Sequence, residues 1–279
     1  MANGKDIGLI TVESTHNYHS CSSLFLLPQQ QKNGIFVVAI LNYKTYYSVD
    51  EREFVMLRIG HRGAKAYAPE NTIASFKKAL EIGVDAVELD VRKTKDNRLV
   101  VIHDADVKRT TNGKGLVSEL TLEEIKGFTA DSSEKIPTLE EALDFLDQKV
   151  KVFIELKETG IEKQVIAIVH KKNLEKNVVI TTFLEDALKK IRELDKDIET
   201  GLIYASHKNP VKAALDLKAN YLLALYRFTH STNVQKAHAN GLKLVVWTIN
   251  IPQEVEEYAK KGVDGIASDK PDILMRVKL

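Results

Sequence analysis

Seven polar side chains with complementary chemistry fall at or near the ends of short apolar segments of this chain. They comprise two imidazoles, one guanidinium, one ammonium and three carboxylates: His61, His103, Arg62, Lys157, Glu88, Asp90 and Glu155. Successive side chains of an extended strand point to opposite faces, so Glu88 and Asp90 share one face, as do Glu155 and Lys157. We therefore expect the seven groups to meet where these segments end.

The combination of these groups indicates metal-assisted cleavage of a phosphoester. Three close carboxylates suit a hard, oxygen-preferring cation such as Mg²⁺ or Ca²⁺, and without one they would repel and some would hold protons. Arg62 and Lys157 are natural partners of a phosphoryl group. Two histidines can supply a base and an acid near neutral pH. The sequence has no Gly-rich phosphate loop, which argues against a nucleotide kinase.

Each residue also has an ordinary structural interpretation, because a single charged residue at a strand end most often belongs to an ion pair. Trp247, the only tryptophan, ends an apolar segment and is either core or a wall of the pocket. Asp269-Lys270-Pro271 is expected to close a turn rather than to take part in chemistry. Histidines in helical or loop segments receive no role: His170, His207, His230 and His238. The specific signal is the set of seven taken together.

A repeated alternation of strands and helices positions these groups. Nine strand-like runs cover residues 57–61, 84–91, 99–103, 150–156, 178–182, 201–204, 221–225, 243–249 and 265–268. Only about seven residues separate the second run from the third, whereas parallel strands need a crossover of about a dozen or more. These two runs are therefore predicted to form an antiparallel hairpin.

The eight remaining strands predict an α/β fold, a (β/α)8 TIM barrel with a short insertion after the hairpin near its second strand. Thr72 and Thr138 are predicted to cap helices, and a short last helix is expected over 272–277. Active sites of such barrels lie at the carboxyl ends of the strands, where the seven groups fall. An open doubly wound sheet is the alternative, but no Gly-x-Gly-x-x-Gly follows a strand.

Composition limits the classes of partner and location. The formal net charge is +1, which argues against a general nucleic-acid or anionic-membrane surface. The longest apolar run, 35–41, is far shorter than the roughly 20 residues of a membrane span, so no stable membrane insertion is expected. Cys21 is the single cysteine, and the first 30 residues lack the features of a secretory signal. We expect a soluble, cytoplasmic protein of unspecified oligomeric state.

Charge density divides the chain near residue 55. Nine of the first 55 residues are charged, against 70 of the remaining 224. Met56 directly precedes the first strand-like run. We predict that residues 1–55 are a dispensable N-terminal extension and that residues 56–279 form the barrel domain, with a small packed N-terminal element as the alternative.

The chain resembles the glycerophosphodiester phosphodiesterase family over residues 57–274, whereas residues 1–55 are not covered. The motifs that carry the resemblance are His61-Arg62-Gly63, Ala68-Pro69-Glu70-Asn71-Thr72, Glu88-Leu89-Asp90-Val91, Val101-Ile102-His103-Asp104, Arg109-Thr110-Thr111-Asn112-Gly113, Ile136-Pro137-Thr138-Leu139, Glu155-Leu156-Lys157, Val246-Trp247-Thr248 and Gly262-Val263-Asp264-Gly265-Ile266. The resemblance implies hydrolysis of small-molecule glycerophosphodiesters to sn-glycerol 3-phosphate and an alcohol. It also implies an insertion, here about 105–135, that caps the active site.

Carried over position by position, the resemblance implies three sets of roles. The divalent cation, Mg²⁺ or Ca²⁺, would be bound by Glu88, Asp90 and Glu155; the acid–base pair would be His61 and His103; the phosphate would be held by Arg62 and Lys157. Two alternative functions stay open. One is a lysophospholipid or phosphoinositide phosphodiesterase on the same barrel, and the other is an inactive binding barrel.

Overall fold

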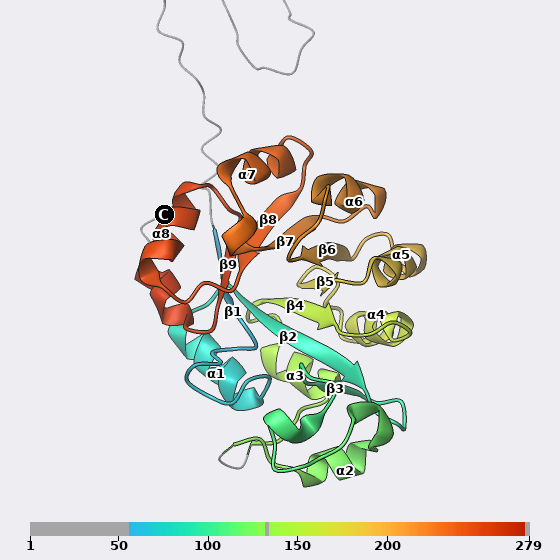
Figure 1. Cartoon of the computed structure of the whole chain (residues 1–279). Helices are drawn as coiled ribbons and strands as arrows, with labels where there is room; N and C mark the ends of the chain where they lie inside the picture. Colours follow the sequence, from blue (N-terminus) through green and yellow to red (C-terminus); the bar gives the residue numbers. More distant parts are fainter. Residues whose placement is uncertain (1–55, 132–133, 277–279) are drawn as a thin grey trace, which may run out of the picture. The chain divides into compact units, whose positions relative to one another are not determined.

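The computed structural model describes residues 56–131 and 134–276, and the structural statements below concern that part of the chain. Eight parallel strands form a closed barrel, because β1 pairs with β9 on one side and with β2 on the other. Helices surround the ring of strands, as Figure 1 shows, so the predicted (β/α)8 TIM barrel is confirmed.

The barrel strands, in chain order, are β1 (Leu57–Gly60), β2 (Ala86–Lys93), β4 (Lys151–Leu156), β5 (Val178–Thr182), β6 (Glu199–Tyr204), β7 (Tyr221–Leu225), β8 (Lys243–Trp247) and β9 (Gly265–Ser268). The α-helices are α1 (Ile73–Ile82), α2 (Leu122–Gly127), α3 (Leu139–Leu146), α4 (Glu162–Lys171), α5 (Glu185–Leu194), α6 (Pro210–Asp216), α7 (Ser231–His238) and α8 (Pro252–Lys260). No helix of the described part of the chain combines the length and the apolarity of a membrane span.

The predicted hairpin is present. Strand β3 (Leu99–Val101) runs antiparallel to the end of β2, with Val91 opposite Val101 and Lys93 opposite Leu99. Strand β3 pairs with β2 outside the closed ring, so β2 keeps its parallel pairing with β1 and β4. The hairpin thereby carries the chain away from the barrel and returns it to His103 beside the carboxyl end of β2.

Alternation along β2 separates core residues from site residues. Val87, Leu89 and Val91 are buried in the apolar layer between the barrel and its helices, whereas Ala86 belongs to the cluster inside the barrel. Because successive side chains of a strand alternate, Glu88 and Asp90 share the inward face with Ala86. The predicted shared face of the two carboxylates is confirmed.

A tight loop joins β1 to α1 and shapes the first edge of the site. As predicted, Thr72 caps α1, by accepting a hydrogen bond from the Ser75 backbone amide (3.3 Å), and Gly83 ends the helix in the left-handed region. Gly63 has φ +80°, and a Cβ there would lie 2.4 Å from the Ser75 hydroxyl oxygen. Only glycine therefore allows the loop to pass this close to α1.

Several predicted strand boundaries are wrong by one or two residues, among them those of β2, β3, β6 and β8, and the last segment differs in helix type. The last segment is a 3-10 helix, η4 (Pro271–Arg276), whose Ile273 amide bonds three residues back to the Lys270 carbonyl (3.1 Å). Strand β6 begins at Glu199, before the predicted residue 201. Glu199 does not belong to an apolar run, and its carboxylate pairs with Lys151 of β4 and Lys243 of β8.

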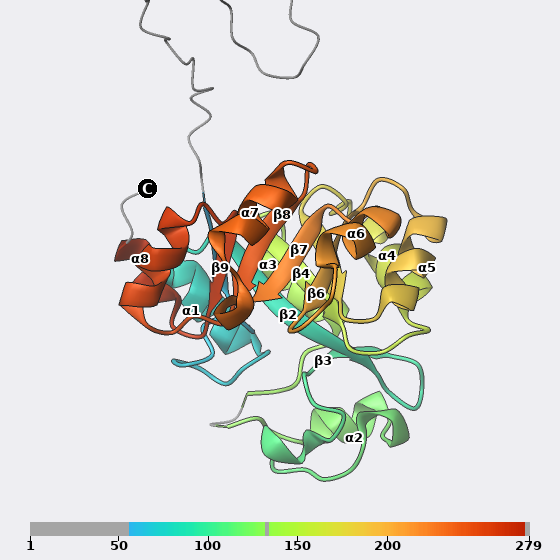
Figure 2. The same cartoon turned by 45° about the horizontal axis from the view of Figure 1, so that its top comes forward.

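The described residues of the predicted insertion, 105–131 and 134–135, form a small substructure of their own. It contains η1 (Val107–Arg109), η2 (Val117–Glu119) and α2, and its apolar side chains pack with Ile102 and Ile136 as a separate cluster. Figure 2 shows the substructure beyond the β2–β3 hairpin. The predicted extension, residues 1–55, lies outside the described residues.

Candidate active site

A cavity of ≈ 320 Å³ opens at the carboxyl ends of the barrel strands. Its polar side is formed by His61, Arg62, Glu88, His103, Glu155 and Lys157. Its apolar side includes side chains of β4, β6, β7 and β8, namely Phe153, Ile203, Leu223 and Trp247. The cavity can therefore hold a charged group on one side and an uncharged group on the other.

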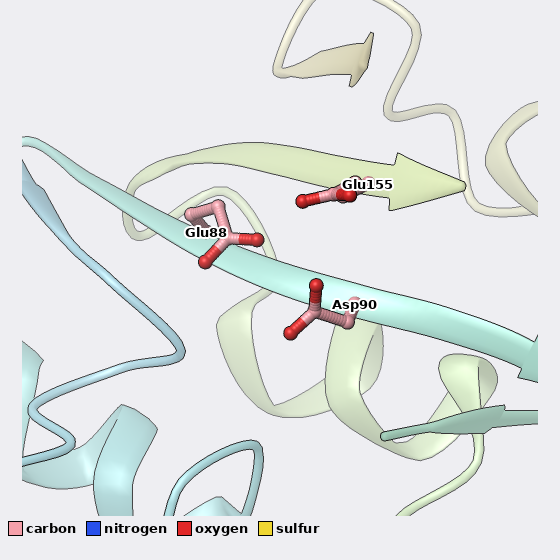
Figure 3. A group of neighbouring side chains, drawn as sticks. All are labelled: Glu88, Asp90 and Glu155. Atoms are coloured by element: carbon pink, nitrogen blue, oxygen red, sulfur yellow. The ribbon is translucent and has the colours of Figure 1, made fainter. Parts of the chain in front are cut away.

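Three carboxylates form the centre of the polar side. Glu88 and Asp90 come from β2 and Glu155 from β4, and the register of the two strands sets Asp90 opposite Glu155. One oxygen of each carboxylate lies within 4.8 Å of the others, and all three residues are buried (Figure 3). The cluster matches the predicted ligand set in composition and position.

The pKa values of the three carboxyl groups are shifted in different directions. Burial, together with the charges of Asp90 and Glu155, raises the pKa of Glu88 well above its usual value. Burial and the charge of Asp90 likewise raise the pKa of Glu155 to about 7. Burial also acts on Asp90, but the neighbouring Arg62, Lys157 and His103 keep the pKa of that carboxyl below its usual range. The cluster therefore takes up protons when no cation is present.

Orphaned oxygen atoms show that this cluster fits a divalent cation. Glu88 Oε1 and Asp90 Oδ1 are buried and have no hydrogen-bond partner among the described residues. Buried polar atoms are nearly always satisfied in folded proteins, so unsatisfied oxygens indicate an additional partner. Carboxylate oxygens are the ligands that Mg²⁺ and Ca²⁺ prefer.

The two cationic side chains of the cavity both contact the carboxylates. Lys157 Nζ lies 2.5 Å from Glu155 Oε1 and 3.5 Å from Asp90 Oδ1. The Arg62 guanidinium donates to Glu70 Oε1 (2.8 Å), and its Nε lies 3.2 Å from Asp90 Oδ2. Both cations face the cavity, where an anionic group of a ligand can reach them.

His61 is oriented by residues that follow β8 and β9. Its Nδ1 lies 2.6 Å from Asp269 Oδ1, and its Nε2 lies 3.8 Å from Glu88 Oε2. Asn250 donates to the other oxygen of Asp269 (2.9 Å). Burial lowers the pKa of His61, and the hydrogen bond to Asp269 opposes that effect in part. Asp269 was expected to close a turn, and the structure adds that its carboxylate bonds a histidine of the cavity.

His103 has a similar carboxylate partner. Its Nδ1 lies 2.6 Å from Oδ1 of the adjacent Asp104, and its backbone carbonyl accepts from Arg92 Nε (2.8 Å). Burial lowers its pKa, although the Asp90 charge and the Asp104 hydrogen bond oppose the shift. The two histidines thus each bond a carboxylate through Nδ1, which leaves Nε2 for a ligand.

Further residues contact the predicted set but were not proposed as site residues from the sequence, among them Glu70, Asn71, Asp104 and Asp269. Asn71 donates to Asp90 Oδ2 (2.8 Å), and its backbone φ of +58° turns the chain there. The sequence signal for Glu70 and Asn71 was present, because both belong to the 68–72 motif. In that motif Thr72 caps α1, whereas Glu70 and Asn71 bind Arg62 and Asp90.

Aromatic side chains form the outer part of the apolar wall. Trp247 lines the cavity, and its Nε1 donates to the Leu223 carbonyl (3.1 Å). The Trp247 ring packs edge-on against Phe183, with centroids 5.8 Å apart. Phe183 is 44% exposed, so the wall continues to the cavity entrance.

Comparison with known proteins shows that this chain is similar to phosphodiesterases. A model of the glycerophosphoryl diester phosphodiesterase family matches residues 61–273. The chain is 39% identical over 235 residues to a glycerophosphodiester phosphodiesterase of Caldanaerobacter subterraneus, covering 79% of this chain and 97% of the relative. It is 31% identical over 253 residues to one of Bacillus subtilis, covering 80% and 86%.

A solved structure adds a bound product. It is an Oleispira antarctica phosphodiesterase in complex with the product sn-glycerol-3-phosphate. The two chains are 30% identical with a TM-score of 0.72, and the match covers 78% of this chain and 94% of that one.

Proposed function

Because this chain belongs to the glycerophosphoryl diester phosphodiesterase family, and is therefore a glycerophosphodiester phosphodiesterase, we propose that it releases sn-glycerol 3-phosphate and an alcohol with the help of a divalent cation. The observation that carries the proposal is the buried carboxylate cluster with orphaned oxygens, beside two histidines and two cations in one cavity. The product named in the Oleispira complex supports the same reaction.

The proposed cation, Mg²⁺ or Ca²⁺, would be held by Glu88, Asp90 and Glu155 and would supply Lewis-acid polarisation of a phosphoryl oxygen. Arg62 and Lys157 bind the remaining phosphoryl oxygens and stabilise the charge that develops on them. Lys157 now pairs with Glu155, so charge neutralisation of the carboxylates would free its ammonium for the substrate.

We assign proton transfer to the two histidines. His61 takes the proton of the attacking hydroxyl, and His103 gives a proton to the oxygen of the departing alcohol. Asp269 and Asp104 hold the Nδ1 atoms, so that Nε2 of each ring carries out the exchange. The attacking hydroxyl is that of water or of the substrate's own glycerol, and detection of a cyclic phosphate would identify the latter.

The test is release of sn-glycerol 3-phosphate from glycerophosphocholine and glycerophosphoethanolamine, with Mg²⁺, with Ca²⁺ and with EDTA. Calorimetric titration of each cation should show binding to the natural protein and to a Glu193→Gln control, but not to Glu155→Gln. Glu193 is an exposed residue of α5 that does not line the cavity. Full activity in EDTA would contradict the role of the cation.

The apolar wall of the cavity favours one alternative substrate, a lysophospholipid whose glycerol carries an acyl chain. Phe183 and Trp247 would contact that chain near the entrance. Release of choline from lysophosphatidylcholine at a rate above that from glycerophosphocholine would establish this alternative. Binding of both compounds without turnover would indicate an inactive barrel.

Two sequence-based expectations are also kept as proposals. We propose that residues 56–279 suffice for activity and that the enzyme works in the cytoplasm. Cell fractionation tests the second proposal, and shortening the chain tests the first.

A further inference from the structure

Arg109 contacts the site without lining its cavity. The residue ends η1 in the substructure of residues 105–135, and its side chain is 48% exposed. None of the described residues of that segment lines the cavity at the barrel mouth. Arg109 nevertheless connects the substructure to two acidic residues that themselves hold residues of the cavity.

The guanidinium of Arg109 binds two carboxylates at once. Nε lies 2.5 Å and Nη2 3.2 Å from the two oxygens of Asp104. Nη1 and Nη2 donate to the two oxygens of Glu70, at 3.0 and 2.8 Å. A planar fork with five N–H donors can make this pattern, whereas an ammonium group cannot span both carboxylates in a fixed geometry.

Each of these two carboxylates also accepts a hydrogen bond from a residue of the cavity. Asp104 Oδ1 accepts from His103 Nδ1 (2.6 Å), and Glu70 Oε1 accepts from Arg62 Nη1 (2.8 Å). The chain of contacts therefore joins the proposed acid to the proposed phosphate-binding residue. It joins the β1–α1 loop to two segments that lie far from it in sequence, the end of the β2–β3 hairpin and the 105–135 substructure that follows the hairpin directly.

Both carboxylates stay ionised near neutral pH. The contacts with Arg109 and Arg62 outweigh burial and lower the pKa of Glu70 to about 2, and the hydrogen bond from Arg109 also lowers the pKa of Asp104. An ionised carboxylate only accepts hydrogen bonds, so Asp104 requires the proton on His103 Nδ1. Nε2 of His103 then carries a lone pair when the ring is neutral and the second proton when the ring is charged.

We propose that Arg109 is a positioning residue for hydrolysis: anchored by Glu70, it holds Asp104 so that His103 keeps its tautomer and its place relative to Arg62. The inference rests on the proposed function, because it concerns the step in which His103 acts as the acid. In that step the P–O bond to the alcohol breaks while a proton moves from His103 Nε2 to the leaving oxygen.

In an Arg109 variant, the expected loss of kcat depends on the leaving group of the substrate. Choline needs a proton as it departs, whereas p-nitrophenolate is stable without one. In Arg109→Ala we expect kcat on glycerophosphocholine to fall on the order of 10²-fold, the cost of a misplaced catalytic group. On bis(p-nitrophenyl) phosphate we expect kcat to stay within about threefold, because the acid contributes little there.

Matched variants distinguish the positioning effect of Arg109 from the effect of its charge and from a loss of protein stability. Arg109→Lys keeps the charge but not the fork, and should behave like Arg109→Ala. Lys108→Ala removes an exposed cation from the same turn and should match the natural protein on both substrates. Asp104→Asn should produce most of the loss alone, and adding Arg109→Ala to it should cost little more, because the two residues act through one histidine.

The tautomer of His103 can be measured without turnover, so it tests the proposal independently of enzyme activity. Imidazole ¹⁵N chemical shifts should assign His103 to the tautomer protonated at Nδ1 in the full chain, and to a mixture in Arg109→Ala. Equal losses on both substrates, or an unchanged His103 tautomer in Arg109→Ala, would overturn the proposal. A natural protein that hydrolyses neither substrate, with the tautomer shift still present, would overturn the proposed function instead.

Discussion

Glu155→Gln is expected to stabilise the metal-free protein while abolishing its activity. In the absence of a cation the Glu155 carboxyl is buried beside Asp90, and burial with that charge raises its pKa to about 7. Glutamine has nearly the same shape, keeps an oxygen for Lys157 and carries no charge. The substitution therefore removes a destabilising ionisation together with a proposed ligand of the cation.

The size of the effect follows from the shifted pKa and depends on pH. The folded-state pKa is about 7 against an ordinary 4.5, and at about 1.4 kcal/mol per pKa unit the difference amounts to about 3 kcal/mol. Because the folded-state pKa is the higher one, the stability that the protonated carboxyl contributes is present below pH 4.5 and is lost as pH rises through 7. The variant should be more stable than the natural protein at pH 8 and nearly equal to it at pH 4.5.

The assay is urea unfolding in EDTA at pH 4.5 and pH 8, followed by circular dichroism. With a denaturant dependence of roughly 2–3 kcal/mol per molar, the midpoint at pH 8 should move up by about 1 M. Glu193→Gln is the control and should change stability by less than about 0.5 kcal/mol, as for other surface substitutions. Saturating Mg²⁺ or Ca²⁺ should stabilise the natural protein and the control but not Glu155→Gln.

One result would refute the reasoning. If Glu155→Gln is no more stable than the natural protein at pH 8 in EDTA, the carboxyl is not held in an unfavourable charge state. A gain of equal size at both pH values would also contradict the reasoning, because it would arise from packing rather than from ionisation.

Three other predictions follow from the same structure. His103→Ala should lower kcat on glycerophosphocholine by about 10²–10⁴-fold, the range for general acid–base catalysis, and initial rates near the natural value would remove His103 from the mechanism. Gly63→Ala should reduce the free energy of unfolding, measured in urea, by about 2 kcal/mol or more, because the added Cβ would overlap Ser75. Gly127→Ala is the control and should not reduce it, because no atom lies within 4 Å of a Cβ there. A chain that starts at Met56 should keep the natural kcat and melting temperature, whereas aggregation or inactivity would show that residues 1–55 are required.

The sequence by itself determined the architecture and most of the polar set. Alternating apolar residues and short strands separated by capped helices predicted the barrel, because those periods reflect which side chains face a core. The same period of two placed Glu88 and Asp90 on one face. Local spacing also predicted the β2–β3 hairpin, since seven residues are too few for a parallel crossover.

Only the tertiary structure decided which groups hold one another. Asp269 lies 208 residues from His61 in sequence, and Arg109 lies 39 residues from Glu70, so no local pattern could pair them. The charge states of the site carboxyl groups also depend on the tertiary structure. Glu88 and Asp90 are two residues apart on one strand, yet their pKa values shift in opposite directions, because Arg62 and Lys157 lie against Asp90 while burial dominates at Glu88. Sequence specifies the type of each group, but distance and burial set its free energy of ionisation.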